Sequence, residues 1–441
     1  MERASKIAHT EIINNADVQA YISQCVLPSP PDPSSLTSLL RDAKDVDTSE
    51  VTTVIAVDGG YAETFVRDEY PSACIAFFTF GPLLFQLSDL RGLDAKRFIA
   101  PEDLQKLKNI ERYTLVLPTK GIRHQGQTSL AATIRKTVFD FFERKRGTDG
   151  EQLITSLKWF LFRRWARTPD ESLGIELAHC PFECGQGVIT FRYGDGTARS
   201  CPTCDRPVYL TDVFRLHERV DEETGASGIS AYVMTMLEQL VLVHLIYSIL
   251  NMKESLLRQI LFIKDGPLAF FGLVAPLYKP MRELVEYLLS EPRGSAGPTI
   301  RLVGLEKSGA FVEHAATIQE RLPAGSYLVV GDNYIRKYIV PGGDGSTSYG
   351  QNTYYGQKVI FRAKTGEMHV ATVPATEYTG SPMPESIPHL DQVLGLVGEL
   401  KCSMYDNALI PVALANKLVS LSDFPSKQIL GTFAKAGMAS E

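Results

Sequence analysis

The sequence predicts an α/β fold in which helices flank a mixed β-sheet and a small cysteine-rich unit interrupts the chain. Three apolar, strand-like runs follow one another early, at residues 51–65, 72–85 and 113–118. Helix-like spacing of apolar residues and further strand-like runs then alternate along the rest of the chain. Four closely paired cysteines lie between two of the predicted helices. A large α/β core with one insertion accounts for these observations.

The composition is typical of a soluble globular protein. The chain has 441 residues, 44% hydrophobic and 22% charged, with a net charge of −6. This balance excludes a uniformly basic nucleic-acid binder but allows a local basic channel. We find no signal-peptide pattern, and Glu238 inside the apolar run 231–250 argues against a membrane span. Seven cysteines, four of them clustered, favour a reducing compartment, so we expect a cytoplasmic protein without membrane association.

The first strand organises the predicted core. Residues 51–65 are mostly β-branched or apolar up to Asp58, where we expect the strand to end in a turn at Gly59 and Gly60. Residues 72–85 predict a second strand, or a hairpin around Gly81, and residues 113–118 a third, most simply as an antiparallel meander. The regions we expect are an N-terminal helical segment (1–47), a first part of the core (48–174), an insertion (175–215) and a second part of the core (216–441).

Three helices follow from the spacing of apolar residues. We expect them at 129–146, 151–167 and 228–252, the last apolar on nearly all sides and therefore buried. The second helix carries Trp159 and Trp165 among basic residues. That combination suits either stacking of a nucleic-acid strand or a packed helix with a solvated basic edge. Strand-like runs at 299–309 and 326–333, a hairpin across 364–366 and helices after 388 complete the chain.

The cysteine pairs predict a structural zinc site. Cys180 and Cys184 form one pair, Cys201 and Cys204 the other, with sixteen residues between them. Four thiolates at this spacing match a closed tetrahedral zinc ribbon. We expect residues 188–199 to form a hairpin between the pairs. His179 is a less favoured substitute ligand because a cysteine is adjacent.

A second set of residues carries carboxylates on apolar elements. Residues 259–272 repeat the strand design of 51–65, with Asp265 and Gly266 at the strand end. Asp58 and Asp265 therefore either converge on one site or occupy separate turns. Glu238, inside the most apolar helix, needs a cation, a donor or a metal. Clustered carboxylates favour Mg²⁺ or Mn²⁺, and two such ions can support phosphodiester hydrolysis. The sequence lacks the motifs of P-loop nucleotide hydrolysis, dinucleotide redox chemistry and serine-hydrolase catalysis.

The order of these elements resembles the ribonuclease H-like fold of two-metal nucleases. More closely, the chain resembles the NurA nuclease family, which partners the HerA translocase, as a bacterial variant with an inserted zinc ribbon. The residues that carry the resemblance are IAVDGGYAE (55–63), FIKDGPLAFFG (262–272), LVGLEKSG (302–309), VVGDNYIRKYI (329–339), and YYGQKVIFRAK (354–364) with VATVP (370–374). The resemblance implies a metal-dependent deoxyribonuclease, a homodimer with DNA threaded between subunits, and a hexameric HerA-type ATPase partner in DNA-end processing or anti-phage defence.

The resemblance also implies site residues. Asp58 and Asp265 would bind Mn²⁺ or Mg²⁺, with Glu238 as the middle acidic ligand and Glu143 as its competitor. Lys307 would contact phosphate, unless it is an ordinary surface lysine. The family's C-terminal Tyr-Pro and Ala-His are missing, and the residues that take that place are Asn416, or Asp406 with Tyr405. The alternative function is a catalytically inactive DNA- or partner-binding subunit that uses the zinc ribbon.

Overall fold

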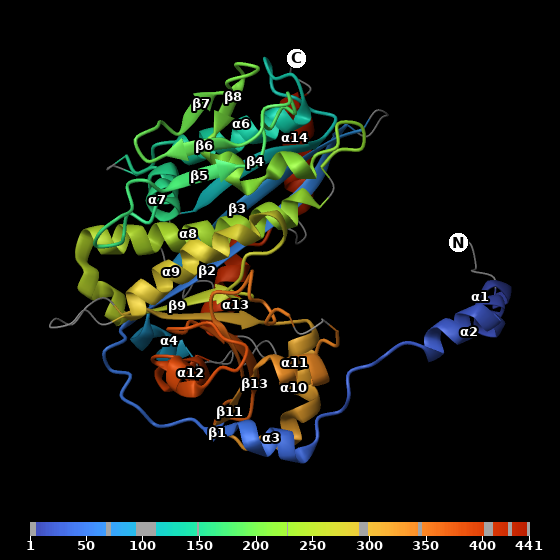
Figure 1. Cartoon of the computed structure of the whole chain (residues 1–441), viewed down its shortest axis with the longest axis vertical. Coiled ribbons are helices and arrows are strands. Elements are labelled where there is room, and N and C mark those ends of the chain that lie inside the picture. Colours follow the sequence, from blue (N-terminus) through green and yellow to red (C-terminus); the bar gives the residue numbers. More distant parts are fainter. Residues whose placement is uncertain are drawn as a thin grey trace.

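A nine-stranded mixed sheet forms the centre of the computed structural model (Figure 1). The structure describes residues 6–67, 72–93, 112–147, 150–226, 228–290, 299–342, 346–400, 409–421 and 426–438. The strands of the central sheet are β1 (Leu40–Asp42), β2 (Thr53–Arg67), β3 (Ala73–Gln86), β4 (Tyr113–Lys120), β9 (Ile260–Asp265), β10 (Arg301–Glu306), β11 (Ser326–Val329), β12 (Gln357–Arg362) and β13 (Met368–Val373).

The sheet topology confirms the predicted fold class. The strand order is β1-β11-β12-β13-β10-β9-β2-β3-β4. Strands β2, β3 and β4 form the expected antiparallel meander, and β9 pairs parallel to β2, with β10 parallel to β9. In the ribonuclease H-like arrangement, three strands form an antiparallel meander, and two further strands lie parallel to the first strand on the side away from the second. Strands β9 and β10 take these two places. The predicted hairpin of β12 and β13 extends the same sheet by antiparallel pairing.

Strand β2 does not end at Asp58, so the predicted turn at the two glycines is wrong. The strand continues to Arg67 and pairs with the whole of β3, which is a single strand without a hairpin at Gly81. The glycines serve close packing instead. A Cβ on Gly59 would lie 2.2 Å from Met234 Cε, and one on Gly60 would lie 2.3 Å from the carbonyl oxygen of Val419. Helices therefore press on β2 from both sides.

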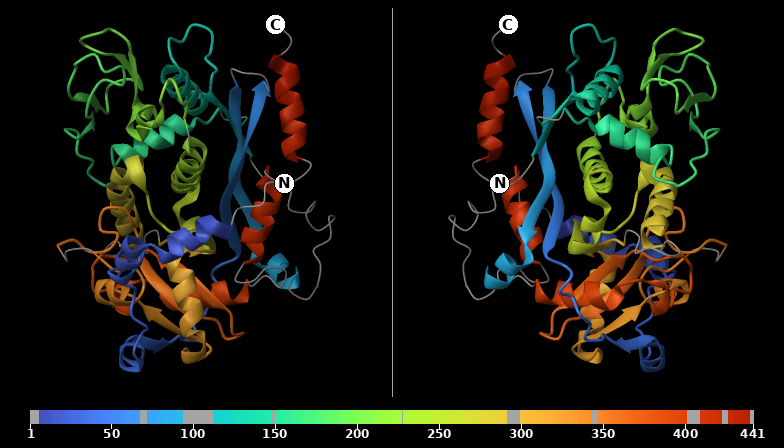
Figure 2. Two further views of the ribbon diagram at one scale, coloured as in Figure 1. Left: turned by 90° about the vertical axis from the view of Figure 1, so that its right-hand side faces the viewer. Right: turned by 90° about the vertical axis from the view of Figure 1, so that its left-hand side faces the viewer.

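The helices cover both faces of the sheet. Val57 and Ile55 point into a core with α6–α9, whereas Val54 and Ala56 point into a second core with α12 and α13. Figure 2 shows β2 and β3 between α8 on one side and α13 and α14 on the other. The helices are α1 (Lys6–Asn14), α2 (Ala16–Ser23), α3 (Pro33–Leu39), α4 (Leu87–Leu93), α6 (Leu130–Glu143), α7 (Leu153–Leu161), α8 (Ile229–Lys253), α9 (Tyr278–Leu289), α10 (Ala310–Ile318), α11 (Asp332–Tyr338), α12 (Leu390–Glu399), α13 (Ile410–Val419) and α14 (Ser426–Met438).

The predicted helices at 129–146 and 228–252 are confirmed as α6 and α8. Ser129 caps α6 by accepting a hydrogen bond from the amide of Ala132 at 3.0 Å. Within the described part of the chain, Ile229–Gln259 is the segment long and apolar enough to cross a membrane, but 72% of its apolar window is buried inside the molecule. Burial of this kind is typical of the core helix of a water-soluble protein.

The insertion contains two small sheets rather than the hairpin we expected. Strand β5 (Gly174–Leu177) pairs with β6 (Ile189–Arg192), and β7 (Ala198–Ser200) pairs with β8 (Pro207–Tyr209). Strands β6 and β7 lie where the hairpin was predicted, but each pairs with a strand outside that segment. The predicted hairpin is therefore wrong, although both of its strands exist. At the N-terminus, α1 and α2 stand apart from the body, while β1 adds a strand to the main sheet (Figure 1).

We predict that Gly59→Ala destabilises the protein by about 1–3 kcal/mol, because the added methyl group must displace Met234 and the Cβ of Phe80, which would lie 2.8 Å away. The measurement is the midpoint of urea unfolding. Gly395→Ala is the matched control, since nothing lies within 4 Å of its added carbon in α12 and a helical alanine stabilises by about 0.5–1 kcal/mol. Equal midpoints for the two variants would contradict the close approach of α8 to β2.

Candidate functional site

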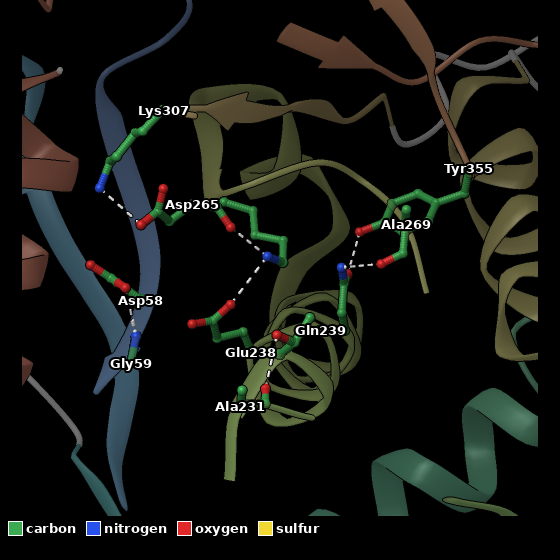
Figure 3. Close-up of polar contacts among 11 residues, drawn as sticks. Asp58, Gly59, Ala231, Glu238, Gln239, Asp265, Ala269, Lys307 and Tyr355 are labelled. Atoms are coloured by element: carbon green, nitrogen blue, oxygen red, sulfur yellow. Dashed lines mark hydrogen bonds and ion pairs between the residues drawn. The ribbon is translucent and has the colours of Figure 1, made fainter. Parts of the chain in front are cut away.

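The sheet brings Asp58 and Asp265 to the same edge. Val57 of β2 is paired with Lys264 of β9, so the two aspartates follow at adjacent positions on neighbouring parallel strands. Their side chains share a face because side chains alternate along strands. Glu238 comes from α8, on the face of β2 to which Ile55 and Val57 point, whereas alternation directs Asp58 to the other face. Figure 3 shows the side chains of Asp58, Asp265 and Glu238 near the end of β9, with β2 between Asp58 and Glu238. The structure thus brings together residues separated by about two hundred positions.

Asp58 is the most constrained of the three acids. Its side chain is buried, with the residue only 4% exposed. One carboxylate oxygen accepts a hydrogen bond from the amide of Gly59 at 2.8 Å, while the other is buried and has no hydrogen-bond partner among the described residues. Burial, followed by the negative charges of Asp265 and Glu238, raises the pKa of Asp58 to about 7. The ionised, buried carboxylate of Asp58 would be stabilised by a nearby cation.

Glu238 is held by a buried lysine. Lys264 Nζ lies 3.1 Å from its carboxylate, and both residues are less than a tenth exposed. The same ammonium group also donates to the carbonyl oxygen of Asp265. Burial raises the pKa of Glu238, and the charge of Lys264 acts in the opposite direction. Lys264 was not among the predicted site residues, although a lysine between apolar residues and Asp265 in the FIKD run was the available signal.

Lys307 is paired with Asp265 at the acidic site. Its ammonium group lies 2.8 Å from an Asp265 carboxylate oxygen. The side chains of Lys307 and Asp265 remain 34% and 26% exposed, which leaves them accessible to a ligand. A sharp turn at Gly266, with φ +82°, follows Asp265. Gly304 of the neighbouring strand allows this turn, because a Cβ there would lie 2.6 Å from the carbonyl oxygen of Gly266.

The oxygen donors of the three carboxylates suit a divalent cation, but they are not yet close enough together to ligate one ion. Asp58 offers a buried oxygen without a partner, and Asp265 and Glu238 offer hard oxygen donors that suit Mg²⁺ or Mn²⁺. In the described part of the chain, however, these three are not among the groups whose ligand atoms all lie within 4.8 Å of one another. Direct coordination of one cation by all three carboxylates would therefore require them to move closer, with Glu238 and Asp265 leaving Lys264 and Lys307.

The alternative residues occupy other places. Glu143, at the end of α6, accepts a hydrogen bond from Thr197 of the insertion at 2.5 Å, and its charge does not contribute to the shifted pKa of Asp58. Asn416 is exposed on α13. Tyr405 and Asp406 lie outside the described residues. Of the two candidates for the middle ligand, Glu238 contributes to the raised pKa of Asp58 and Glu143 does not.

The four cysteines of the insertion converge as predicted. Their sulfur atoms all lie within 4.8 Å of one another, a spacing compatible with a tetrahedral zinc ion. Each pair sits on a tight turn, in which the amide of Glu183 donates to the carbonyl of Cys180 and that of Asp205 to the carbonyl of Cys201, both at 2.9 Å. Both donors have positive φ, near 51° and 57°. The backbone thus bends sharply at both cysteine pairs.

The helix predicted at 151–167 is shorter than expected: α7 ends at Leu161, so Trp159 lies in the helix and Trp165 in the turn that follows it, and both pack inside the molecule. Trp159 contacts Tyr247 with ring centroids 5.3 Å apart, and Trp165 contacts Tyr287 at 5.4 Å. Arg163 forms an ion pair with an acidic residue of α9 at 2.8 Å. These contacts favour the interpretation of a packed helix with a basic edge over a platform for stacking nucleic acid.

Comparisons with known proteins give only weak structural likeness. No protein-family model matches the chain, and no curated protein matches it significantly in sequence. The crystal structure of the NurA nuclease from Sulfolobus solfataricus aligns with 100% of this chain and 99% of its own, at 8% identity and a TM-score of 0.37. A structure of NurA with manganese aligns with 98% of this chain and 95% of its own, at 11% identity and a TM-score of 0.28. Likeness at this level does not assign a function.

We predict that Asp58 makes the protein less stable as the pH rises. Its folded-state pKa of about 7 lies above the unfolded value of 3.8, so the stability it contributes is complete below pH 3.8 and is lost as the pH rises through 7. In buffer without Mg²⁺ or Mn²⁺, the free energy of unfolding of Asp58→Asn relative to that of the natural protein should rise by about 4 kcal/mol as the pH rises from 3.8 to 7. Urea unfolding at several pH values measures the difference. A difference that does not change with pH would show that Asp58 is well solvated.

We also predict that the cysteine cluster holds zinc. Cys201→Ser should lose zinc from the purified protein and several kcal/mol of stability, because binding of a structural metal is coupled to folding. Elemental analysis and thermal unfolding are the measurements. Cys25→Ser is the control, since that cysteine is exposed and outside the cluster. Equal zinc contents in the two variants would exclude this site.

Proposed function

We propose that this protein is a Mn²⁺- or Mg²⁺-dependent deoxyribonuclease. The observation that carries the proposal is the buried, partly unpaired carboxylate of Asp58, next to Asp265 on a neighbouring parallel strand and close enough to Glu238 of α8 for that charge to raise its pKa. Structural ion pairs are normally satisfied within the protein, whereas a carboxylate with a raised pKa and an oxygen without a partner is typical of a functional site. The ribonuclease H-like sheet topology agrees with this assignment.

Each side chain has a role that follows from its surroundings. Asp58 and Asp265 would hold the cation, with Glu238 on the side of α8. When bound, the cation would activate water and stabilise the charge that develops on the phosphate. Lys264 keeps the buried Glu238 in place through its ion pair. Lys307, once released from Asp265, presents an exposed ammonium group to a phosphate oxygen.

The finer features of the proposal rest on the sequence resemblance to the NurA family. They are DNA as the substrate, a homodimer, a HerA-type hexameric ATPase as partner, and a role in DNA-end processing or anti-phage defence in the cytoplasm. The supporting motifs occur in the family's order from residue 55 to residue 374. The zinc ribbon would stabilise the insertion, because its four ligands leave no open position on the metal.

A second function is favoured by one specific observation. Lys264 and Lys307 already pair with Glu238 and Asp265, and the three carboxylates do not lie within 4.8 Å of one another. If lysines neutralise all the carboxylates, the site has no charge left to bind a catalytic cation. The protein would then be a catalytically inactive subunit that binds DNA or a partner through its zinc ribbon. Asp58 distinguishes the two functions, since the described residues provide no lysine or arginine ion pair for it.

We predict that Asp58→Asn and Asp265→Asn each lower Mn²⁺-dependent cleavage of linear DNA by about 100-fold or more, because each removes a cation ligand. The measurement is the initial rate with purified protein. Asp58→Asn should leave folding intact, since it removes a buried charge. Cleavage at the natural rate in both variants would exclude this site, and absence of cleavage in the natural protein with any divalent cation would favour the inactive subunit.

The middle acid is tested by a matched pair. Glu238→Gln should lower the rate strongly, whereas Glu143→Gln should leave it within about twofold, because the Glu143 side chain bonds to the insertion and not to the acidic site. The reverse result would assign the middle position to Glu143. Circular dichroism of both variants controls for loss of folding.

A further inference from the structure

A second group of metal-binding side chains lies beside the cysteine cluster. His179, which the sequence places directly before Cys180, does not substitute for a cysteine. It meets His217 and Glu218 of the short helix η2 (Leu216–Arg219), and the three offer ligand atoms that all lie within 4.8 Å of one another. In the described part of the chain, this is the one such group besides the four cysteines.

The imidazole of His217 is largely buried, and one of its two nitrogens lacks a hydrogen-bond partner among the described residues. The side chain of His217 is only 10% exposed, and its Nδ1 has no hydrogen-bond partner among the described residues. Its Nε2 lies 3.9 Å from a carboxylate oxygen of Glu218, too far for a hydrogen bond. The rings of His179 and His217 stand edge to face, with centroids 6.1 Å apart. A buried polar atom without a partner is costly unless it has a ligand.

Glu218 is held in a fixed orientation. Arg215 donates to both of its carboxylate oxygens at 2.6 Å, and this ion pair leaves each oxygen with further lone pairs. Residues that orient a ligand in this way commonly accompany metal sites. Arg215 itself has φ 54°, the left-handed conformation, where the chain turns between two short helices. The backbone is therefore bent at the point that brings Glu218 toward the histidines.

The group lines a cavity of about 360 Å³ between the insertion and the core. His179 and Glu176 line it from the insertion, and Pro276 and Lys279 from the segment before and at the start of α9. A cation with only three protein ligands keeps an open coordination position. The cavity has room for a water molecule or a small anion at that position.

We propose that His179, His217 and Glu218 bind a second transition-metal ion, with zinc as the expected metal, and that its open position faces this cavity. Two imidazoles and a carboxylate are a donor set that zinc accepts readily, and the set differs from both the all-sulfur cluster and the all-oxygen acidic site. The metal fastens the cysteine-bearing insertion to η2. The proposal does not depend on nuclease activity.

Zinc content of the full-length protein after gel filtration tests the proposal. The natural protein should hold one more zinc ion per chain than His217→Asn and Glu218→Gln, and His124→Asn should match the natural protein because His124 is exposed and outside the group. Cobalt replacement separates the two sites. The sulfur-to-cobalt absorption of the cysteine cluster should persist in His217→Asn, which also shows that the insertion remains folded.

Azide, a small anion that binds cobalt, probes the open position. It should change the cobalt spectrum of the natural protein and leave that of His217→Asn unchanged. Equal zinc contents in the natural protein and His217→Asn would overturn the second site. A cobalt spectrum of the natural protein that azide does not change would overturn the open coordination position.

Discussion

The burial of a carboxylate among other carboxylates is the constraint on which the structure around β2 depends. Asp58 lies in the middle of a long strand that is covered on both faces, and part of its charge has no compensation among the described residues. Lys264 and Lys307 compensate its two acidic neighbours but form no ion pair with Asp58 itself. A folded protein retains such an arrangement at a cost in stability, which a bound cation would offset.

The rest of the core holds this charge in place. Gly59 lets α8 approach β2 closely enough for the charge of Glu238 to act on Asp58, and Gly60 lets the end of α13 approach from the other side. Parallel pairing of β2 with β9 then adds Asp265. The site is thus built from a strand, its parallel neighbour and the covering helix, all of them rigid elements. The cysteine cluster lies in the insertion, outside this acidic site.

Local patterns in the sequence predicted the elements well and their pairing less well. The meander, the buried helix α8 and the convergence of the cysteines follow from spacing that the structure keeps. The turn expected at Gly59 was wrong because glycine has two uses, and only the partner helix shows that close packing decided here. The hairpin expected in the insertion was wrong because strands of three or four residues carry too little pattern to fix their partners. Lys264 was missed because its partner, Glu238, lies on a different element, and the sequence alone does not show that the two side chains meet.

The most direct test of the account is anomalous X-ray diffraction from crystals of the protein soaked in Mn²⁺. We predict a manganese peak within bonding distance of the carboxylates of Asp58 and Asp265, with Lys307 displaced from Asp265. A structure at high Mn²⁺ without a peak there, in which both lysines keep their ion pairs, would contradict it. The carboxylates would then be a neutralised part of the core and not a cation site.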